Sequence, residues 1–233
     1  SQLIGAAFGS SGERCMALSV AVVVGESTAN ELVSKLKKNM EGLKVGNHSD
    51  PGNDFGPLIT QEHKDKVIFY IDSAENQGAT IVVDGRKVRV SGHEQGFFVG
   101  GTLVDHVTKD MLSYQEEIFG PVLQIVRVKS MEEAMKLIDS HEYGNGTCIF
   151  TRDGEAARFF SDNIRVGMVG INIPLPVPVA YHSFGGWKDS LYGDLFAYGP
   201  DGVRFYTRRK TITQRWPSSD VREGIQFSMP TLK

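Results

Sequence analysis

A cysteine near the start of the chain is the side chain best suited to covalent chemistry. Cys15 lies in the stretch FGSSGERCMALS (8–19), where a glycine–serine turn runs into an apolar segment and Arg14 directly precedes the thiol. The thiolate is the reactive form of cysteine, and a neighbouring cation favours it. The small residues of the turn would also let a substrate approach the backbone closely. From this spacing two interpretations stay open, a nucleophile and a buried small hydrophobic residue.

Composition excludes several other kinds of protein. Of the 233 residues 40% are hydrophobic and 23% charged, which is typical of a globular domain. A net charge of -3 gives no reason to expect a nucleic-acid or membrane partner. No apolar run reaches the length of a membrane span. The second cysteine, Cys148, is far from Cys15 in the chain, so we expect no disulfide framework and a cytoplasmic location.

Other common catalytic and binding patterns are missing from the sequence. The six histidines show no metal-ligand spacing and do not pair with the cysteines, so we expect no metal. No Gly-x-Gly-x-x-Gly or phosphate-binding loop motif occurs, and no Gly-x-Ser-x-Gly nucleophile turn. The chain therefore carries no nucleotide-binding fingerprint of its own.

Strand and helix patterns alternate along the chain. Short β-branched runs predict strands at 19–26, 79–85, 146–153 and 166–173. Amphipathic segments predict helices at 27–43, behind a Ser/Thr cap, at 59–78, behind Thr60, and at 130–140 and 154–163. This alternation favours an α/β fold with a mainly parallel, twisted sheet and flanking helices. Cys148, inside an apolar strand, should be buried and unreactive. The tail at 203–216 is expected to be an exposed strand that seeks a partner.

Three further segments together resemble a known family. They are QEEIFGPVL (115–123), SFGGWKDS (183–190) and YGPDGVRFYTRRKTIT (198–213), and in this order they resemble the C-terminal, catalytic half of the aldehyde dehydrogenase superfamily. GERCMALS (12–19) and GINIPLPVPVAYHSFGGWK (170–188) resemble its CoA-acylating branch, the methylmalonate-semialdehyde dehydrogenases.

The resemblance implies a covalent oxidation at Cys15. The thiolate would attack an aldehyde, and hydride transfer to NAD would leave a thioester, with the Cys15 N–H as one oxyanion donor. In the CoA-acylating branch the acyl group then passes to CoA, so (methyl)malonate semialdehyde would yield propionyl-CoA or acetyl-CoA. Two alternatives remain: a hydrolytic NAD-dependent aldehyde dehydrogenase, or an inactive isolated domain that only self-associates.

The resemblance also assigns cofactor and substrate residues. Glu117 would hold the nicotinamide ribose hydroxyls and Phe119 would pack beside the nicotinamide. The alternatives are a helix-capping or surface carboxylate for Glu117 and plain core packing for Phe119. Residues 174–184 match the substrate-entrance loop, where Phe184 would wall the aldehyde pocket. Arg14 and His182 are weaker candidates for the substrate pocket, and a lone loop histidine such as His182 is more often a bystander.

Two further positions invite comparison with the family. Lys188, the lysine of the Phe-Gly-Gly-x-Lys motif, is interpreted as structural. Glu13 stands where the family commonly has Gln. A carboxylate pointing at Cys15 would raise its thiol pKa, so we expect Glu13 to point away, held by neighbouring backbone or a cation.

The resemblance divides the chain into two parts. Residues 1–200 would form the catalytic domain, and 201–233 a C-terminal strand and tail that joins subunits into a homo-oligomer, a dimer or a tetramer. The family's N-terminal NAD-binding domain is missing from the sequence. We therefore expect a fragment that is inactive alone and that depends on the absent domain for most of its NAD binding.

Overall fold

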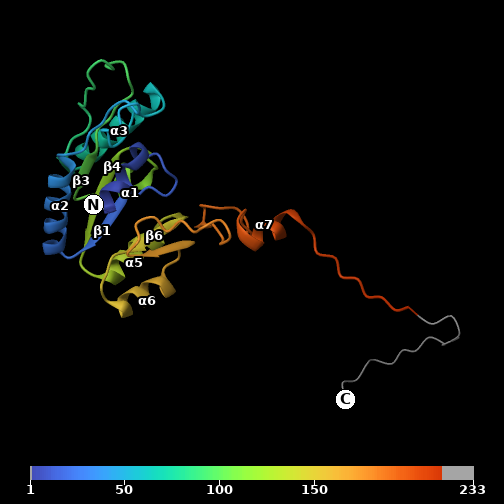
Figure 1. Cartoon of the computed structure of the whole chain (residues 1–233). Helices are drawn as coiled ribbons and strands as arrows, with labels where there is room; N and C mark the ends of the chain where they lie inside the picture. The colour runs from blue at the N-terminus through green and yellow to red at the C-terminus, as the bar shows by residue number, and fades with distance from the viewer. Residues whose placement is uncertain (1, 217–233) are drawn as a thin grey trace.

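A computed structural model describes residues 2–216 of the chain (Figure 1). Its helices and strands follow in this order: α1 (Gln2–Phe8), the short 3-10 helix η1 (Gly9–Gly12), β1 (Val20–Val24), α2 (Glu26–Met40), α3 (Gln61–Asn76), β2 (Thr80–Val83), β3 (Thr102–Asp105), α4 (Leu112–Gln115), β4 (Val122–Val128), α5 (Met131–Ser140), β5 (Tyr143–Gly144), β6 (Gly146–Ile149), α6 (Gly154–Asn163), β7 (Met168–Ile171), β8 (Trp187–Lys188) and α7 (Gly199–Tyr206).

The main sheet has four strands in the order β1-β4-β3-β2. β4 pairs parallel with both β1 and β3, and Val20 lies opposite Gln124 in the β1–β4 register. The expected α/β fold with parallel strands and flanking helices is confirmed. Two details differ from the predicted fold. β2 runs antiparallel to β3, and the pairs β6–β7 and β5–β8 form separate two-stranded sheets rather than extending the main one.

Helices cover both faces of the main sheet, as Figure 1 shows. The alternation of side chains along β4 explains the two layers. Leu123 and Ile125 are buried in a cluster with α1 and α2. Val122 and Val126 point to the opposite face and are buried with α3 and α5. The core is therefore two apolar layers with β4 between them.

Local capping sets the starts of three of the predicted helices. Thr60 caps α3, Ser130 caps α5 and Asp153 caps α6, each by accepting a hydrogen bond from a backbone N–H in the first turn of its helix. The Ser/Thr cap predicted for α2 is wrong, because that helix begins at Glu26 behind Gly25. Gly25 has a φ of 88° and donates its N–H to the carbonyl of Val128, so the turn out of β1 ends at the glycine.

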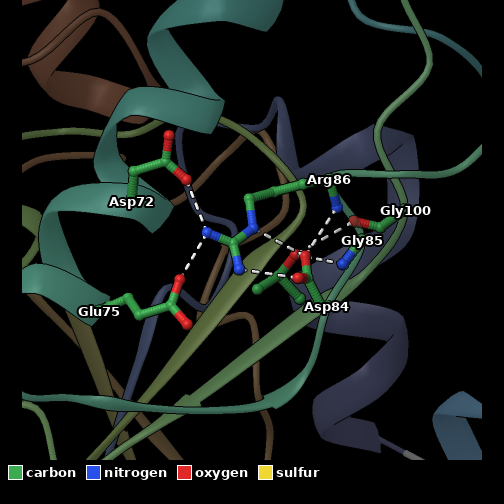
Figure 2. Close-up of polar contacts among 7 residues, drawn as sticks. Asp72, Glu75, Asp84, Gly85, Arg86 and Gly100 are labelled. Atoms are coloured by element: carbon green, nitrogen blue, oxygen red, sulfur yellow. Dashed lines mark hydrogen bonds and ion pairs between the residues drawn. The ribbon is translucent and has the colours of Figure 1, made fainter.

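A half-buried arginine, Arg86, fastens the second half of α3 to the end of β2. Figure 2 shows the Arg86 guanidinium between Asp72 and Glu75 of α3 on one side and Asp84 on the other. Its Nη1 lies 2.6 Å from Asp72 Oδ1 and 2.7 Å from Glu75 Oε2, and its Nη2 lies 2.7 Å from Asp84 Oδ2. The side chain is only 18% exposed, so this network fixes α3 independently of the contacts at its N-terminal end.

The C-terminal part departs from the sequence prediction. Residues 203–206 end the helix α7, and 207–216 form no strand, so the predicted strand at 203–216 is wrong for the described chain. Pro200 in the first turn favours the helix. A strand also needs a neighbour for its backbone hydrogen bonds, and residues 207–216 run away from the rest of the described chain in Figure 1. The remaining tail, 217–233, lies outside the described residues.

Candidate active site

Cys15 follows a tight turn that the sequence builds from small residues. Ser10, Ser11 and Gly12 have φ values of 52°, 58° and 72°, so three successive residues adopt the left-handed conformation. The buried Ser11 Oγ donates a hydrogen bond to the carbonyl of Gly56 at 2.8 Å and so fixes the turn from outside. The turn leaves Cys15 exposed, which agrees with a nucleophile and not with a buried hydrophobic residue.

A second loop, residues 116–120, lies against this turn. It connects α4 to β4, whereas the cysteine loop leads into β1, and these two strands are parallel neighbours. Both loops therefore lie at the amino ends of their strands. A Cβ on Gly12 would overlap the carbonyl group of Gly120, so the two backbones touch at a point where no side chain fits. The motifs FGSSGERC and EEIFGP are thus brought together by the sheet.

The two loops enclose a hollow of about 130 Å³. Four sequence-predicted residues line it, namely Arg14, Cys15, Glu117 and Phe119. Arg14, Cys15 and Glu117 are exposed, and Phe119 is 37% exposed, so their reactive or recognising groups are accessible. Among the described residues no carboxylate forms an ion pair with Arg14, which donates only its Nε–H, to Ser10 Oγ at 3.1 Å. The hollow therefore has an unneutralised cation beside a free thiol.

Phe119 has an unusual backbone conformation. Its φ of 57° is left-handed, which costs a bulky L-residue about 1–2 kcal/mol. The Phe119 carbonyl is held by His63 of α3, whose Nε2 lies 2.7 Å away. Because a carbonyl oxygen only accepts, the Nε2 atom must carry the proton in this contact. The exposed aromatic ring is thus presented by a strained but anchored peptide.

Glu13 also contacts this histidine. Its Oε1 lies 3.4 Å from His63 Nε2, and its side chain is only 12% exposed. Burial raises the pKa of the Glu13 carboxyl, partly offset by the charge of His63 when protonated and by the backbone of Ile59. The carboxylate is thus held by a histidine and a backbone group, the kind of partners expected for a side chain that does not point at the thiol.

The start of the 116–120 loop is tied to α3 as well. Tyr70 donates its hydroxyl to Glu116 Oε2 in a short hydrogen bond. This hydrogen bond, with burial and the charge of Glu116 adding to it, raises the pKa of Tyr70 to about 12. Tyr70 therefore stays neutral and keeps donating throughout the ordinary pH range. Glu117, the next residue, is left free to face the hollow.

The inner wall of the hollow carries two polar atoms without partners. Ser113 and Gln124 both line it and are nearly fully buried, and Ser113 Oγ and Gln124 Oε1 make no hydrogen bond in the described chain. Gln124 Nε2 does donate to the Ser113 carbonyl at 2.8 Å. An unpaired buried polar atom costs about 1–3 kcal/mol, so a water or a polar ligand group reaching this wall would stabilise it.

These features fit one end of a nicotinamide cofactor. Drug-sized ligands and whole cofactors occupy pockets of about 300–1,000 Å³, so the smaller hollow fits an aromatic ring rather than a dinucleotide. An exposed phenyl ring, a free carboxylate and hydrogen-bonding atoms surround it. The rest of such a cofactor would have to lie outside this hollow.

The side chain of Asn145, directly before β6, contacts the backbone of Cys15. Asn145 Nδ2 lies 3.4 Å from the Cys15 carbonyl oxygen and 3.1 Å from Met16 Sδ. Among the described residues the Cys15 N–H makes no hydrogen bond, so it is free to donate to a bound group. Sequence reasoning missed Asn145, 130 positions from Cys15, and His63, 56 positions from Phe119, because no motif marks either residue.

Two predicted substrate residues do not line this hollow. His182 is exposed and packs against Tyr181 with ring centroids 4.7 Å apart. Phe184 packs instead against Tyr198, at 5.7 Å, beside the start of α7. Phe184 therefore does not line the hollow beside Cys15, and its place in the wall of the aldehyde pocket stays a prediction. Lys188 has the expected structural role, donating to the carbonyls of Ile138, Asp139 and His141 at the end of α5.

Cys148 differs from the prediction in its burial. It is half-buried rather than buried, because the residue opposite it in the β6–β7 register is Gly170, which has no side chain to cover the thiol. Burial still raises the pKa of the Cys148 thiol. Its reactive thiolate is thus less accessible and less populated at neutral pH.

The described part of the chain shows neither a metal-binding cluster nor a membrane-spanning helix. Residues 2–216 contain no group of three or more His, Cys, Asp or Glu side chains that could hold a metal ion. In the same part of the chain no helix is both long and apolar enough to cross a membrane.

The sequence profile of the aldehyde dehydrogenase family matches residues 1–212. The chain belongs to this family. Among curated aldehyde dehydrogenases, the malonate-semialdehyde dehydrogenase of Pseudomonas aeruginosa is 65% identical over 232 residues, which are 100% of this chain and 47% of that protein. The chain spans about half the length of the curated relatives it matches.

Solved aldehyde dehydrogenase structures have the same fold. Methylmalonate-semialdehyde dehydrogenase from Oceanimonas doudoroffii matches with a TM-score of 0.92 and 76% identity, over 95% of this chain and 46% of that one. A methylmalonate-semialdehyde dehydrogenase candidate from Sinorhizobium meliloti, complexed with NAD, matches with a TM-score of 0.92 and 56% identity, over 94% of this chain and 44% of that one. These matches confirm the fold and family inferred from the motifs.

Proposed function

We propose that this chain supplies the nucleophile of an NAD-dependent, CoA-acylating oxidation of malonate or methylmalonate semialdehyde. The observation that carries the proposal is the shared hollow, which brings an exposed cysteine, an unpaired arginine and the EEIFGP loop together. The names of the relatives give the substrate class, and the NAD complex of one neighbour supports the cofactor.

Cys15 would form and hold the acyl group. Its thiolate attacks the aldehyde carbon, and the oxygen becomes an oxyanion that the free Cys15 N–H can stabilise. NAD, held at Glu117 and Phe119, would supply the hydride acceptor, so that loss of hydride from this carbon would leave a thioester on Cys15. The thiolate of CoA then takes the acyl group and Cys15 is released as a thiolate. The substrate carboxyl leaves as carbon dioxide and a proton takes its place on the α-carbon, so malonate semialdehyde gives acetyl-CoA and its methyl homologue gives propionyl-CoA.

Arg14 would select the acid. A semialdehyde of this class carries a carboxylate two carbons from the aldehyde carbon, and a guanidinium binds such a group through paired hydrogen bonds. Arg14 lines the same hollow as Cys15 and has no carboxylate partner in the described chain. Glu117 and Phe119 would hold the nicotinamide end of the cofactor from the opposite loop, as the family resemblance implies.

The test uses a protein of the relatives' full length that includes this chain. With malonate semialdehyde, NAD and CoA, mass spectrometry should detect acetyl-CoA, and Cys15→Ser should abolish it. Arg14→Gln should raise the KM for malonate semialdehyde about 10- to 100-fold, the value of a charged hydrogen bond, and leave the KM for propanal unchanged. Free acid as the main product would favour the hydrolytic alternative, and turnover by Cys15→Ser would overturn the proposal.

We further propose that the exposed segment 207–216 pairs with a partner subunit's sheet in a homo-oligomer, and that the enzyme is cytoplasmic. Residues 207–216 are exposed and lie outside the strands of the described chain. Truncation after Tyr206 should then reduce the oligomer to a smaller species in light scattering. An unchanged mass would contradict the assignment of 201–233 as an assembly segment.

A further inference from the structure

One face of α3 holds the loop that carries Glu117 and Phe119. His63, Val67 and Tyr70 lie at spacings of four and three residues, so they project from the same side of the helix. Tyr70 binds Glu116, and a Cβ on Gly120 would lie only 2.6 Å from a methyl carbon of Val67. Between these two contacts, His63 binds the carbonyl of Phe119.

His63 differs from the other two because it also reaches the cysteine loop. Its Nε2 lies 2.7 Å from the Phe119 oxygen and 3.4 Å from the Glu13 carboxylate, two residues before Cys15. Both partners are acceptors, so a single N–H faces both loops at once. The histidine ring is itself fixed, since its own backbone N–H is capped by Thr60 and its side chain is only 19% exposed.

We propose that His63 is a positioning residue that sets the separation of the cysteine loop and the 116–120 loop. Its Nε2–H keeps the Phe119 peptide in its left-handed conformation, so that the phenyl ring faces the hollow at a fixed distance from Cys15. The inference rests on the proposed function in one respect only, that the 116–120 loop receives the nicotinamide end of the cofactor.

The structure separates this role from general stabilisation of α3. The other end of the helix is fastened by Arg86 to Asp72, Glu75 and Asp84, as Figure 2 shows. Loss of the His63 contact would therefore loosen the Phe119 peptide and leave the helix in place. Loss of Arg86 would weaken the helix attachment and leave the His63–Phe119 contact intact.

The experiment compares four variants in a protein that has the full length of the relatives and includes this chain. Glutamine places an N–H donor close to the position of Nε2, whereas asparagine is too short to reach it. His63→Ala and His63→Asn should increase hydrogen exchange at the amides of 116–120 and raise the KM for NAD about 3- to 10-fold, as loss of one hydrogen bond allows. His63→Gln should stay within about twofold of the wild type on both readouts.

Arg86→Ala is the matched control for stability. It should lower the melting temperature at least as much as His63→Asn and leave exchange at 116–120 and the KM for NAD unchanged. The proposal is overturned if His63→Gln behaves like His63→Asn, if exchange at 116–120 does not change in His63→Asn, or if Arg86→Ala has the same local effect. Hydrogen exchange needs no substrate or cofactor, so it decides the inference even if no acyl-CoA is formed and the proposed function fails.

Discussion

Gly12 and Gly120 touch through their backbones, and this contact joins the cysteine loop to the loop that carries Phe119. The contact depends on the absence of a side chain at Gly12, whose φ of 72° is itself unfavourable for other residues. The geometry of the hollow thus depends on a position that carries no functional group.

The first prediction concerns this contact. Gly12→Ala should separate the two loops, because the new methyl group would overlap the Gly120 carbonyl, a rigid backbone group. We expect a loss of stability of about 1–3 kcal/mol, typical of strain plus overpacking, and a larger loss of activity than of stability. Urea unfolding and steady-state kinetics measure the two effects. Gly5→Ala is the control, since a Cβ at Gly5 meets nothing within 4 Å; equal effects of both substitutions would contradict the role of the contact.

The second prediction concerns the two thiols. Iodoacetamide should alkylate Cys15 at least about tenfold faster than Cys148 at neutral pH, because Cys15 is exposed whereas burial hinders Cys148 and raises the pKa of its thiol. Peptide mass spectrometry measures both rates in one sample. Cys15→Ser should leave only the slow reaction, and similar rates at both positions would remove the structural argument for a poised nucleophile.

A third prediction follows from Tyr70. Tyr70→Phe removes the hydrogen bond to Glu116 and should cost about 0.5–1.5 kcal/mol of stability. Because the pKa of Tyr70 is raised to about 12 from 10.0 in an unstructured chain, this stabilisation is complete below pH 10 and is lost as the pH rises toward 12. The difference in unfolding free energy between wild type and variant should therefore be constant at neutral pH and shrink in strong alkali. A stability difference that grows above pH 10 would contradict this prediction.

A fourth prediction concerns a buried ion pair in the main sheet. Asp105 of β3 accepts from Arg127 of β4 at 2.7 and 3.0 Å, and its side chain is 5% exposed. Burial raises the pKa of Asp105, but hydrogen bonds from Arg127 and the backbone of His106 outweigh it and hold the pKa below 3.8. A lowered carboxyl pKa stabilises the fold above the unfolded value and loses this effect as the pH falls below it.

The Asp105→Asn variant tests that sign. It should be less stable than the wild type by about 3 kcal/mol at neutral pH, because the arginine keeps its burial and loses its main partner. The gap should close as the pH falls through the wild-type carboxyl pKa. Urea unfolding of both proteins over a pH series measures this difference in stability. A gap that widens in acid would show that the pair does not lower the pKa of Asp105.

Local signals in the sequence anticipated much of the fold. The Thr60 cap located α3, the apolar runs located β1, β2, β6 and β7, and the motifs around Cys15 and Phe119 identified the two loops of the site. These features depend on neighbouring residues, so one sequence is enough to recognise them.

The remainder depends on contacts between distant residues. His63 and Phe119 are 56 positions apart, and nothing near His63 indicates that its ring binds a carbonyl. Phe119 adopts a left-handed conformation that its residue type disfavours, so propensity argues against the observed geometry. The segment at 203–216 has the composition of a strand, but its first residues complete α7 and the rest forms no strand in the described chain.

The parallel register of β1 and β4 has a consequence for how this site can vary. Val20 lies opposite Gln124, and Cys15 and Phe119 each stand five positions before these two residues (15 to 20 and 119 to 124). The thiol and the phenyl ring are therefore carried on connections of equal length from one shared level of the sheet. Adding or removing a residue in one connection would shift one group past the other by up to about 3.3 Å, the rise of one residue in a strand. A change in the length of one connection should therefore require the same change in the other.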